Sequence, residues 1–416
     1  MYIKENGDFM LLRFTFKNFK SFCDEAVLDL TASSITEHKD SLITVNNIDI
    51  LPIAAIFGAN GSGKSNCIEA LVAMGTEVYG YKSKEGRESI ITPYYFDDEY
   101  RNSPSEFEVC VYSYELNKEF RYGFCRTNKE VLEEWLFMKT FSKTPSVKEK
   151  CVFYRKKGSK LESELTNQNE LKEINFVSSV TSNDELIVTN IGKRDKCKYS
   201  YIYYWFADHI IFMNFSNFNE SQGYKNQNFL ELLFEEEEWL SLVEDMIKLV
   251  DPAIIGLKVE KEVDSNMSDY YVIYSKHKKN DNTDIKVPFS TESCGTKKML
   301  YLSLNLVFSL KFGRPCFIDE LDSKLHPLLL RYIVQMYTNK SKNKGGGQLI
   351  FSSHNLICLD SSDLRRDEIW FVEKNNQKST IFSLYDFKEE TIRKDLDFGK
   401  HYLNGRFGAV PFNDEG

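Results

Sequence analysis

The chain has 416 residues, of which 42% are hydrophobic and 14% aromatic, and its formal net charge is −9 at pH 7. This composition suffices for a sizeable core, and the acidic balance argues against a protein that coats nucleic acid, although a local basic patch stays open. No apolar run approaches the ~20 residues that a membrane span needs. The nine cysteines contain no C-x-x-C pair, which favours reduced thiols. We therefore expect a cytoplasmic protein without a membrane partner or a structural zinc site.

The first part of the chain predicts strands. Apolar residues alternate with period two over several segments, which is typical of half-buried strands. Asn117-Lys118 separates two of these segments and predicts an antiparallel hairpin. The strands expected in this part of the chain are residues 11–22 (a strand that turns into a loop), 26–30, 105–114, 119–124, 131–139 and 150–155, of which the last two extend the sheet of the hairpin.

A glycine-rich loop interrupts this series, between an apolar run at residues 51–57 and a helix at residues 66–74. Its sequence, GANGSGKS at residues 58–65, fits the pattern G-x-x-x-x-G-K-[ST]. Glycines let backbone N–H groups converge on phosphates, and the helix dipole adds positive charge there. Lys64 can reach the β- and γ-phosphates and Ser65 can ligate Mg²⁺. The loop predicts a nucleoside triphosphate site. Its candidate contacts are Gly58, Asn60, Gly61, Gly63, Lys64, Ser65 and Asn66.

Residues 160–255 have a different character, because the two-fold alternation gives way to longer mixed segments. Residues 228–250 predict an amphipathic helix or a broken pair of helices that stops at Asp251-Pro252. We interpret the acidic run at residues 235–238 as a solvated helix face.

Two further features of this segment have alternative explanations. The aromatic run at residues 199–205 favours a core segment over a platform for stacking bases. The basic clusters at residues 155–160 and 193–198 favour solvated loops, with an acidic partner or nucleic acid as the alternative.

The C-terminal part supplies acids and a histidine that complete a predicted ATP site. The apolar strand at residues 315–319 ends in Asp319 and Glu320. Asp319 suits Mg²⁺ coordination and Glu320 suits polarisation of the attacking water. Another apolar strand begins at Gln348 and leads to His354, which lies beside the expected phosphate site in a parallel sheet and can contact the γ-phosphate.

A second anion site precedes the acidic strand. Residues 291–298, TESCGTKK, form a small-polar turn with one glycine before a helix at residues 299–310. Within one copy this site is redundant with residues 58–65. It makes sense if it faces the γ-phosphate held by another subunit.

Five motifs in this order, GANGSGKS, ESCGTK, CFIDE, LDSKLHP and SSHN, resemble the ABC-type ATPase heads of the SMC, Rad50 and RecF group. The resemblance covers about residues 10–150 and 255–416. It implies an α/β fold in which a mixed core sheet with the phosphate loop joins an antiparallel β-subdomain and a largely helical insertion. The implied division is an N-terminal lobe at 1–159, an insertion for interaction or oligomerisation at 160–255 and a C-terminal lobe at 256–416.

The same resemblance implies a dimer in which two heads enclose two ATP molecules with Mg²⁺. Ser293 and Gly295, with Thr296 in the same turn, would bind the partner's γ-phosphate, and Asp322 would lie across the dimer seam. Two departures matter: the signature reads Ser-Cys-Gly-Thr-Lys rather than Leu-Ser-Gly-Gly-Gln, and residues 93–97 lack the glutamine that the group has there. We therefore expect ATP hydrolysis with slow turnover.

A narrower likeness covers almost the whole chain. FTFKNFKSF, PSEFEV, ESCGTK, LRRDEIWFVEK and KHYLNGRFGAVPFND are similar to stand-alone ATPases of bacterial anti-phage and abortive-infection loci, of the RloA/AbiL type and the AriA-like type of PARIS systems. This likeness implies a sensor or scaffold whose ATP-driven state controls a separate effector, often a nuclease or toxin encoded nearby. A phage protein as trigger and a homo-oligomer larger than a dimer stay open.

Three alternatives are weaker. A RecF/SMC-like DNA repair ATPase would need a long coiled coil or a continuous basic surface, whereas the chain has no heptad array and is acidic. A nuclease of the OLD type carries a Toprim domain, and too few residues follow His354 for one. The unusual signature and the large insertion argue against a transporter subunit.

Overall fold

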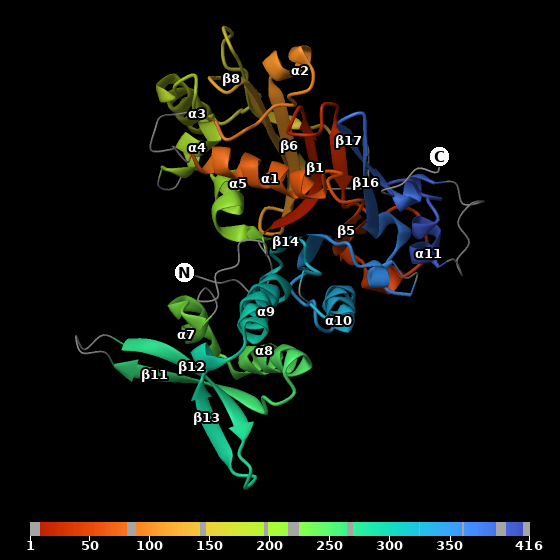
Figure 1. Ribbon diagram of the computed structural model, residues 1–416. Helices are drawn as coiled ribbons and strands as arrows, with labels where there is room; N and C mark the ends of the chain where they lie inside the picture. The colour runs from red at the N-terminus through yellow and green to blue at the C-terminus, as the bar shows by residue number, and fades with distance from the viewer. Residues whose placement is uncertain are drawn as a thin grey trace.

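Two six-stranded sheets and one three-stranded sheet organise the chain. The computed structural model describes residues 9–80, 89–141, 147–194, 199–214, 224–263, 269–323, 325–359, 362–387 and 397–410. Figure 1 shows an antiparallel sheet at one end, the core sheet in the middle and a small lobe at the other end. Among the described residues, no helix has the length and the apolar character needed to cross a bilayer.

The core sheet has the strand order β10-β14-β15-β5-β16-β17. Its first five strands are parallel and β17 is antiparallel to β16, so the predicted mixed sheet is confirmed. Every residue of β5, β14 and β15 is buried, as is typical of parallel strands covered on both faces. The strands are β5 (Ile53–Phe57), β10 (Ile211–Asn214), β14 (Pro315–Asp319), β15 (Gln348–Ser352), β16 (Ile369–Asn375) and β17 (Lys378–Ser383).

Alternate residues of β5 face two different hydrophobic cores, because successive side chains of a strand point to opposite faces. Ala54 belongs to the core that includes α1 (Lys64–Tyr79) and the antiparallel sheet. Ile53 belongs to the core that includes α9 (Cys294–Phe312) and α10 (Pro327–Thr338). Helix α1 therefore lies between the two large sheets, with the phosphate loop at its N-terminus.

The antiparallel sheet has the order β2-β1-β6-β7-β8-β9, and the predicted hairpin is confirmed. Most of its buried aromatic side chains pack in the same core as α1. A two-stranded ribbon, β3 (Ile43–Val45) with β4 (Ile48–Ile50), lies beside it in sequence. The strands are β1 (Phe9–Lys17), β2 (Ala26–Asp29), β6 (Ser105–Ser113), β7 (Lys118–Arg126), β8 (Val131–Thr140) and β9 (Lys150–Lys156), and α2 (Asp98–Asn102) precedes β6.

The described part of residues 160–255 is largely helical, but it is divided among three parts of the fold. The first helices join the core of α1, and β10 forms the edge of the core sheet. The last two helices belong to the small lobe. This differs from the single insertion that we expected, because the apolar faces of these helices pack on different sheets. The helices are α3 (Gln168–Val180), α4 (Ile187–Gly192), α5 (Tyr201–Tyr204) with a π-helical turn (Trp205–His209), α7 (Gln227–Glu235) and α8 (Glu237–Val250).

Two features predicted inside this segment can be compared with the structure. The expected helix pair breaks at Glu236, whose extended backbone separates α7 from α8 within the acidic run. In the aromatic run, Tyr199, Ile202 and Trp205 are buried, which confirms a core segment. Residues 195–198 of one basic cluster lie outside the described residues.

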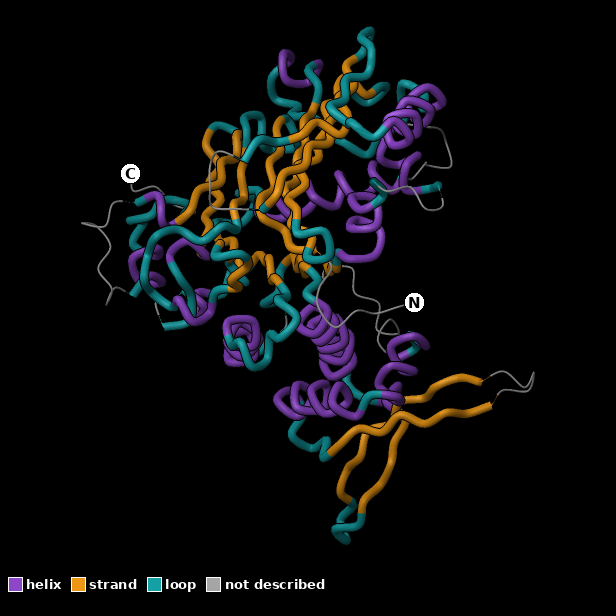
Figure 2. The backbone as a smooth tube through the Cα atoms, turned by 180° about the vertical axis from the view of Figure 1, so that it is seen from behind, coloured by secondary structure: helices purple, strands orange, loops and turns teal. Residues whose placement is uncertain are grey.

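The small lobe consists of α7, α8 and the sheet β11-β12-β13, and it extends away from the core sheet (Figure 2). Helices α7 and α8 pack on this sheet, and a short 3₁₀ turn, η4 (Phe289–Thr291), leads from it into α9. The strands are β11 (Gly256–Val263), β12 (Asp269–Lys278) and β13 (Asp284–Pro288).

The LRRDE stretch that precedes β16 forms a buried ionic network. The guanidinium of Arg365, which has no exposed surface, donates to both oxygens of Asp367 at 2.9 and 2.8 Å. Asp367 also accepts hydrogen bonds from the backbone N–H and hydroxyl of Ser33. This network fixes β16 behind the phosphate loop. The remaining short elements are η1 (Lys39–Ser41), η5 (Leu356–Cys358), η6 (Arg366–Glu368), η7 (Leu384–Asp386) and α11 (Phe398–Leu403).

Candidate functional site

The glycine-rich loop connects β5 to α1, and its backbone conformation requires glycine at two tightly packed positions. Gly58 has φ +153°, and a Cβ there would lie 2.3 Å from the carbonyl oxygen of Val372. Gly63 has φ +115°, and a Cβ there would lie 2.6 Å from Ser379 Oγ. Gly61 has φ +75°, and a Cβ there would have no neighbouring atom within 4 Å. The loop is thus closely packed at both ends and open at its tip, where a ligand can approach.

Lys64 begins α1 and is buried beneath this loop. Its Nζ donates to the carbonyl oxygens of Gly58 at 2.8 Å and Ala59 at 3.0 Å. Ser65, the next residue, donates to Asp319 Oδ1 at 3.2 Å. Asn60 is exposed at the rim. The loop and the end of β14 therefore meet as the sequence predicted.

Three polar side chains, from the segment after β1, from α1 and from β17, brace the loop, and two of them were missed in the sequence. Asn66 Nδ2 donates to Ser21 Oγ at 2.7 Å. Ser379 Oγ lies 2.8 Å from Ser21 Oγ and 2.5 Å from the carbonyl oxygen of Ser62. Asn66 is therefore part of this bracing cluster. Ser21 lies in the FTFKNFKSF motif, whereas Ser379 belongs to an alternating strand without any distinguishing pattern.

The carboxylate of Asp319, the last residue of β14, and the backbone of Glu320 are held by a serine of the neighbouring strand. Ser352 Oγ donates to Asp319 Oδ1 at 2.6 Å and accepts from the backbone N–H of Glu320 at 2.8 Å. Glu320 has φ +53°, a left-handed conformation that is unfavourable for a residue with a side chain. Such strain persists only where the surroundings enforce it, and Ser352 supplies that constraint. The result is a fixed backbone position for Glu320 directly after Asp319.

His354 and Asp322 lie together beyond the ends of β15 and β14. The backbone N–H of His354 donates to Asp322 Oδ2 at 3.1 Å, and the ring is exposed. The other oxygen, Asp322 Oδ1, is buried and accepts no hydrogen bond within the described part of the chain. A buried carboxylate oxygen without a donor is costly, so this oxygen is available to a group from outside the chain.

The charged groups around Lys64 lie close enough to influence one another. Burial lowers the pKa of Lys64 to about 8, while the nearby carboxylates of Asp319, Asp322 and Glu320 oppose that shift. Burial and then the charge of Lys64 lower the pKa of His354. At neutral pH, Lys64 is therefore mostly charged and His354 is neutral.

The pKa of Lys64 predicts how nucleotide affinity depends on pH. Bound phosphates favour the charged amine and raise its pKa, so binding above pH 8 requires uptake of a proton. We expect ATP affinity to fall by roughly fivefold to tenfold per pH unit between pH 8 and 10. Titration with a fluorescent ATP analogue measures this. Lys64→Arg, whose guanidinium stays charged, should show a flat profile, and a flat profile in the parent protein would contradict the assignment.

The residues present fit a magnesium ion held together with phosphates. Mg²⁺ prefers one or two protein oxygens plus substrate phosphates and water, and the Ser65 hydroxyl and the Asp319 carboxylate provide two adjacent oxygens. Within the described ranges, no group of three or more His, Cys, Asp or Glu side chains is arranged to hold a metal ion. A cation here would therefore depend on the nucleotide.

The turn at residues 293–296 is attached to the small lobe. Ser293 caps α9, because its Oγ accepts from the Thr296 N–H at 3.1 Å. Thr296 Oγ1 lies 3.5 Å from Asp251 Oδ2 at the end of α8. Ser293, Cys294 and Gly295 are exposed. The turn therefore presents its surface outward.

Neither backbone conformation nor packing among the described residues requires glycine at position 295. Its φ is ordinary, and a Cβ there would meet only Ser293 Oγ at 3.7 Å. The open space above Gly295 instead suits close approach of another molecule.

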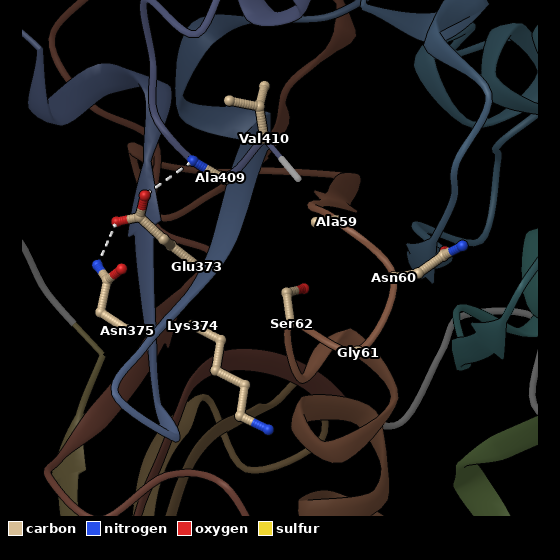
Figure 3. A pocket seen from close by; sticks show the side chains of 9 residues that line it. All are labelled: Ala59, Asn60, Gly61, Ser62, Glu373, Lys374, Asn375, Ala409 and Val410. Atoms are coloured by element: carbon tan, nitrogen blue, oxygen red, sulfur yellow. Dashed lines mark hydrogen bonds between the residues drawn. The ribbon is translucent and has the colours of Figure 1, made fainter. Parts of the chain in front are cut away.

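A pocket of about 300 Å³ opens on the outer side of the phosphate loop (Figure 3). It lies between Gly61-Ser62 and the end of β16, and Ala409 from the C-terminal part lines it. The backbone N–H of Ala59 donates to the carbonyl oxygen of Ala409 at 3.0 Å, and Glu373 Oε1 accepts from the N–H of Ala409 at 3.1 Å. The C-terminal segment thus supports the loop from behind, which the sequence did not predict.

Comparison with known proteins gives one family and several structures. The family described as "AAA domain, putative AbiEii toxin, Type IV TA system" matches residues 53–360. The SMC head domain from Thermotoga maritima is similar with a TM-score of 0.38 and 16% identity, over 90% of this chain and 98% of that chain. The dimeric, post-hydrolysis ATP-binding cassette MJ0796 bound to ADP and Pi is similar with a TM-score of 0.30 and 11% identity, over 90% of this chain and 100% of that chain. No curated protein matches.

Proposed function

The chain belongs to the family described as AAA domain, putative AbiEii toxin of a type IV toxin–antitoxin system, and from this premise we propose that it is an ATP hydrolase. In this proposal two copies close around two ATP molecules. Each site combines the phosphate loop of one copy with the Ser293–Thr296 turn of the other.

One observation carries the proposal: the phosphate loop and the acids at the end of β14 converge in the structure. Ser65 Oγ lies 3.2 Å from Asp319 Oδ1, and Glu320 follows in a conformation fixed by Ser352. A phosphate-binding loop, a cation-binding acid and a second positioned carboxylate are the parts that phosphoryl transfer to water requires. No other cluster in the described ranges combines them.

The proposed roles within one copy follow from these positions. The backbone of the loop, from Gly58 through Asn60, Gly61 and Gly63, and the amine of Lys64 would bind the phosphates. Ser65 and Asp319 would hold Mg²⁺, which neutralises charge on the β- and γ-phosphate oxygens when bound. Glu320 would orient and deprotonate the attacking water. Neutral His354 would donate a hydrogen bond to the γ-phosphate.

The proposed roles between copies rest on two observations. Gly295 is exposed with open space above it, and the N-terminus of α9, capped by Ser293, favours an anion. Asp322 has one buried oxygen without a donor, as expected for a group that meets the opposing copy. Ser293, Gly295 and Thr296 would bind the partner's γ-phosphate, and Asp322 would bridge the seam.

We propose that ATP-driven closure controls a separate effector, a nuclease or toxin, in abortive infection. The toxin–antitoxin description of the family supports a role of this kind. The RloA/AbiL-like or AriA-like assignment, an effector encoded nearby and a phage trigger are the finer parts of this proposal. Turnover that rises strongly with duplex DNA would instead favour the RecF/SMC-like repair function.

Cys294 offers a direct test of closure, because it lies in the turn and is exposed, whereas most other described cysteines are buried. In Glu320→Gln with ATP and Mg²⁺, we expect maleimide labelling of Cys294 to slow about tenfold or more. A slowing of this size corresponds to closure of at least ~90% of the copies. Peptide-resolved mass spectrometry measures the rate at this cysteine alone. Lys64→Ala is the control and should gain no protection. Equal labelling with and without ATP in Glu320→Gln would refute closure over this turn.

A further inference from the structure

The residue before the signature turn, Glu292, is held by two side chains of the small lobe. Its Oε1 accepts from the hydroxyl of Ser275 and lies 2.8 Å from His277 Nε2. Ser275 is completely buried in β12, and the Glu292 side chain is only 11% exposed. A carboxylate is buried at a cost unless it is hydrogen-bonded, and charge-assisted bonds of this kind are the strong ones. Glu292 is therefore fixed to the small sheet.

The backbone next to Glu292 is also fixed, and this determines the direction in which the chain enters α9. Phe289, at the start of η4, is fully buried, and the N–H of Glu292 donates to its carbonyl oxygen at 3.1 Å. Ser293, the very next residue, is the N-cap of α9. With Phe289 and Glu292 both fixed, the chain enters α9 at one angle.

The same helix reaches the loop that follows β14. Lys298, buried in the first turns of α9, donates from Nζ to the carbonyl oxygen of Ser323 at 2.6 Å. Ser323 adjoins Asp322, whose Oδ2 accepts from the N–H of His354. A continuous set of hydrogen bonds and helix backbone thus runs from β12 through Glu292 and α9 to the predicted catalytic cluster.

We infer that Glu292 is a positioning residue: it fixes the Ser293–Thr296 turn to the small lobe so that the turn meets the phosphate of the opposing copy in one geometry. This inference rests on the proposed function. The small lobe is then the part of each copy whose movement would change the other copy's site. Glu292 touches no nucleotide, and it acts through Ser293.

The test compares nucleotide binding with turnover. In Glu292→Ala, ATP affinity in dilute protein should stay within about twofold of the parent, because the phosphate loop lies elsewhere. Turnover should fall about tenfold to 10²-fold, since misplacement of a contact group by ~1 Å has effects of this size. Glu292→Gln, which can still accept from Ser275, should recover part of the rate. Glu260→Ala, in the same sheet where Glu260 pairs with Lys258 and Lys286, is the matched control and should keep the parent rate.

Mixing separates a positioning role from a general loss of structure. Glu292→Ala has an intact phosphate loop, and Lys64→Ala has an intact signature turn, so one site of each mixed dimer is complete. Activity should return on mixing to up to about a quarter of the parent rate, because half of the dimers are mixed and each has one complete site. A defect that only unfolds the variant would not be rescued.

The outcomes distinguish this inference from the proposed function. If Lys64→Ala mixed with Ser293→Arg regains activity but the mixture with Glu292→Ala does not, Glu292 does not position the turn. Parent-like turnover of Glu292→Ala alone would also refute it. If neither mixture regains activity, the shared site itself is wrong.

Discussion

Glu320→Gln is expected to bind ATP and to lose at least ~10²-fold in turnover, the effect of removing one catalytic acid–base group. The amide has the size of the carboxylate but cannot accept the proton of the attacking water. Because Ser352 holds the backbone N–H of Glu320 at 2.8 Å, the substitution leaves the loop geometry in place. ATP should accumulate in a closed dimer. Phosphate release measures turnover, and size-exclusion chromatography with and without ATP measures closure.

A control for this variant has to remove a carboxylate elsewhere. Glu130 pairs with Lys157 at the surface of the antiparallel sheet, and Glu130→Gln should keep the parent rate and the parent elution. Turnover of Glu320→Gln near the parent rate would reject Glu320 as the base. Loss of ATP binding in this variant would instead assign the residue to nucleotide binding.

The local parts of the site could be predicted from the sequence, because their signals lie within a few residues of each other. The loop at residues 58–65 combines glycines at forced positions with a buried strand before it and a helix after it. Asp319 and Glu320 end an apolar run in the sequence. Every residue of β14 is buried in the structure, which confirms that this run forms a buried strand. Alternation of apolar and polar residues indicates a half-buried strand, and a short continuous apolar run bounded by turn residues is consistent with a fully buried one.

The parts that depend on contacts between distant segments could not be predicted. Ser21 and Ser379 are 358 positions apart and meet only because β17 closes the core sheet beside the loop. Ala409 reaches Ala59 through the fold of the C-terminal segment. The division of residues 160–255 has the same cause, since helix periodicity shows which face is apolar but not which sheet it covers.

The role of the Ser293–Thr296 turn could not be inferred from contacts within one chain, because its proposed partner lies in another copy of the chain.

We expect Lys64→Ala and Ser293→Arg to be inactive when each is assayed alone. In Lys64→Ala the phosphates lose their buried amine. In Ser293→Arg a bulky side chain replaces the N-cap of α9 and occupies the exposed surface beside Gly295. Mixed in equal amounts, the two should regain up to about a quarter of the parent rate, since only the mixed dimer has a complete site.

The dependence on concentration gives this experiment its control. A site shared between copies requires association, so the regained rate per molecule should fall on dilution, by mass action. The double variant Lys64→Ala with Ser293→Arg, mixed with inactive Lys64→Ala, has no complete phosphate loop in either copy and should stay inactive. Failure of the first mixture at every concentration would mean that each copy hydrolyses ATP within its own chain. The exposure of Gly295 and the buried, unpaired oxygen of Asp322 would then need a partner other than a second copy.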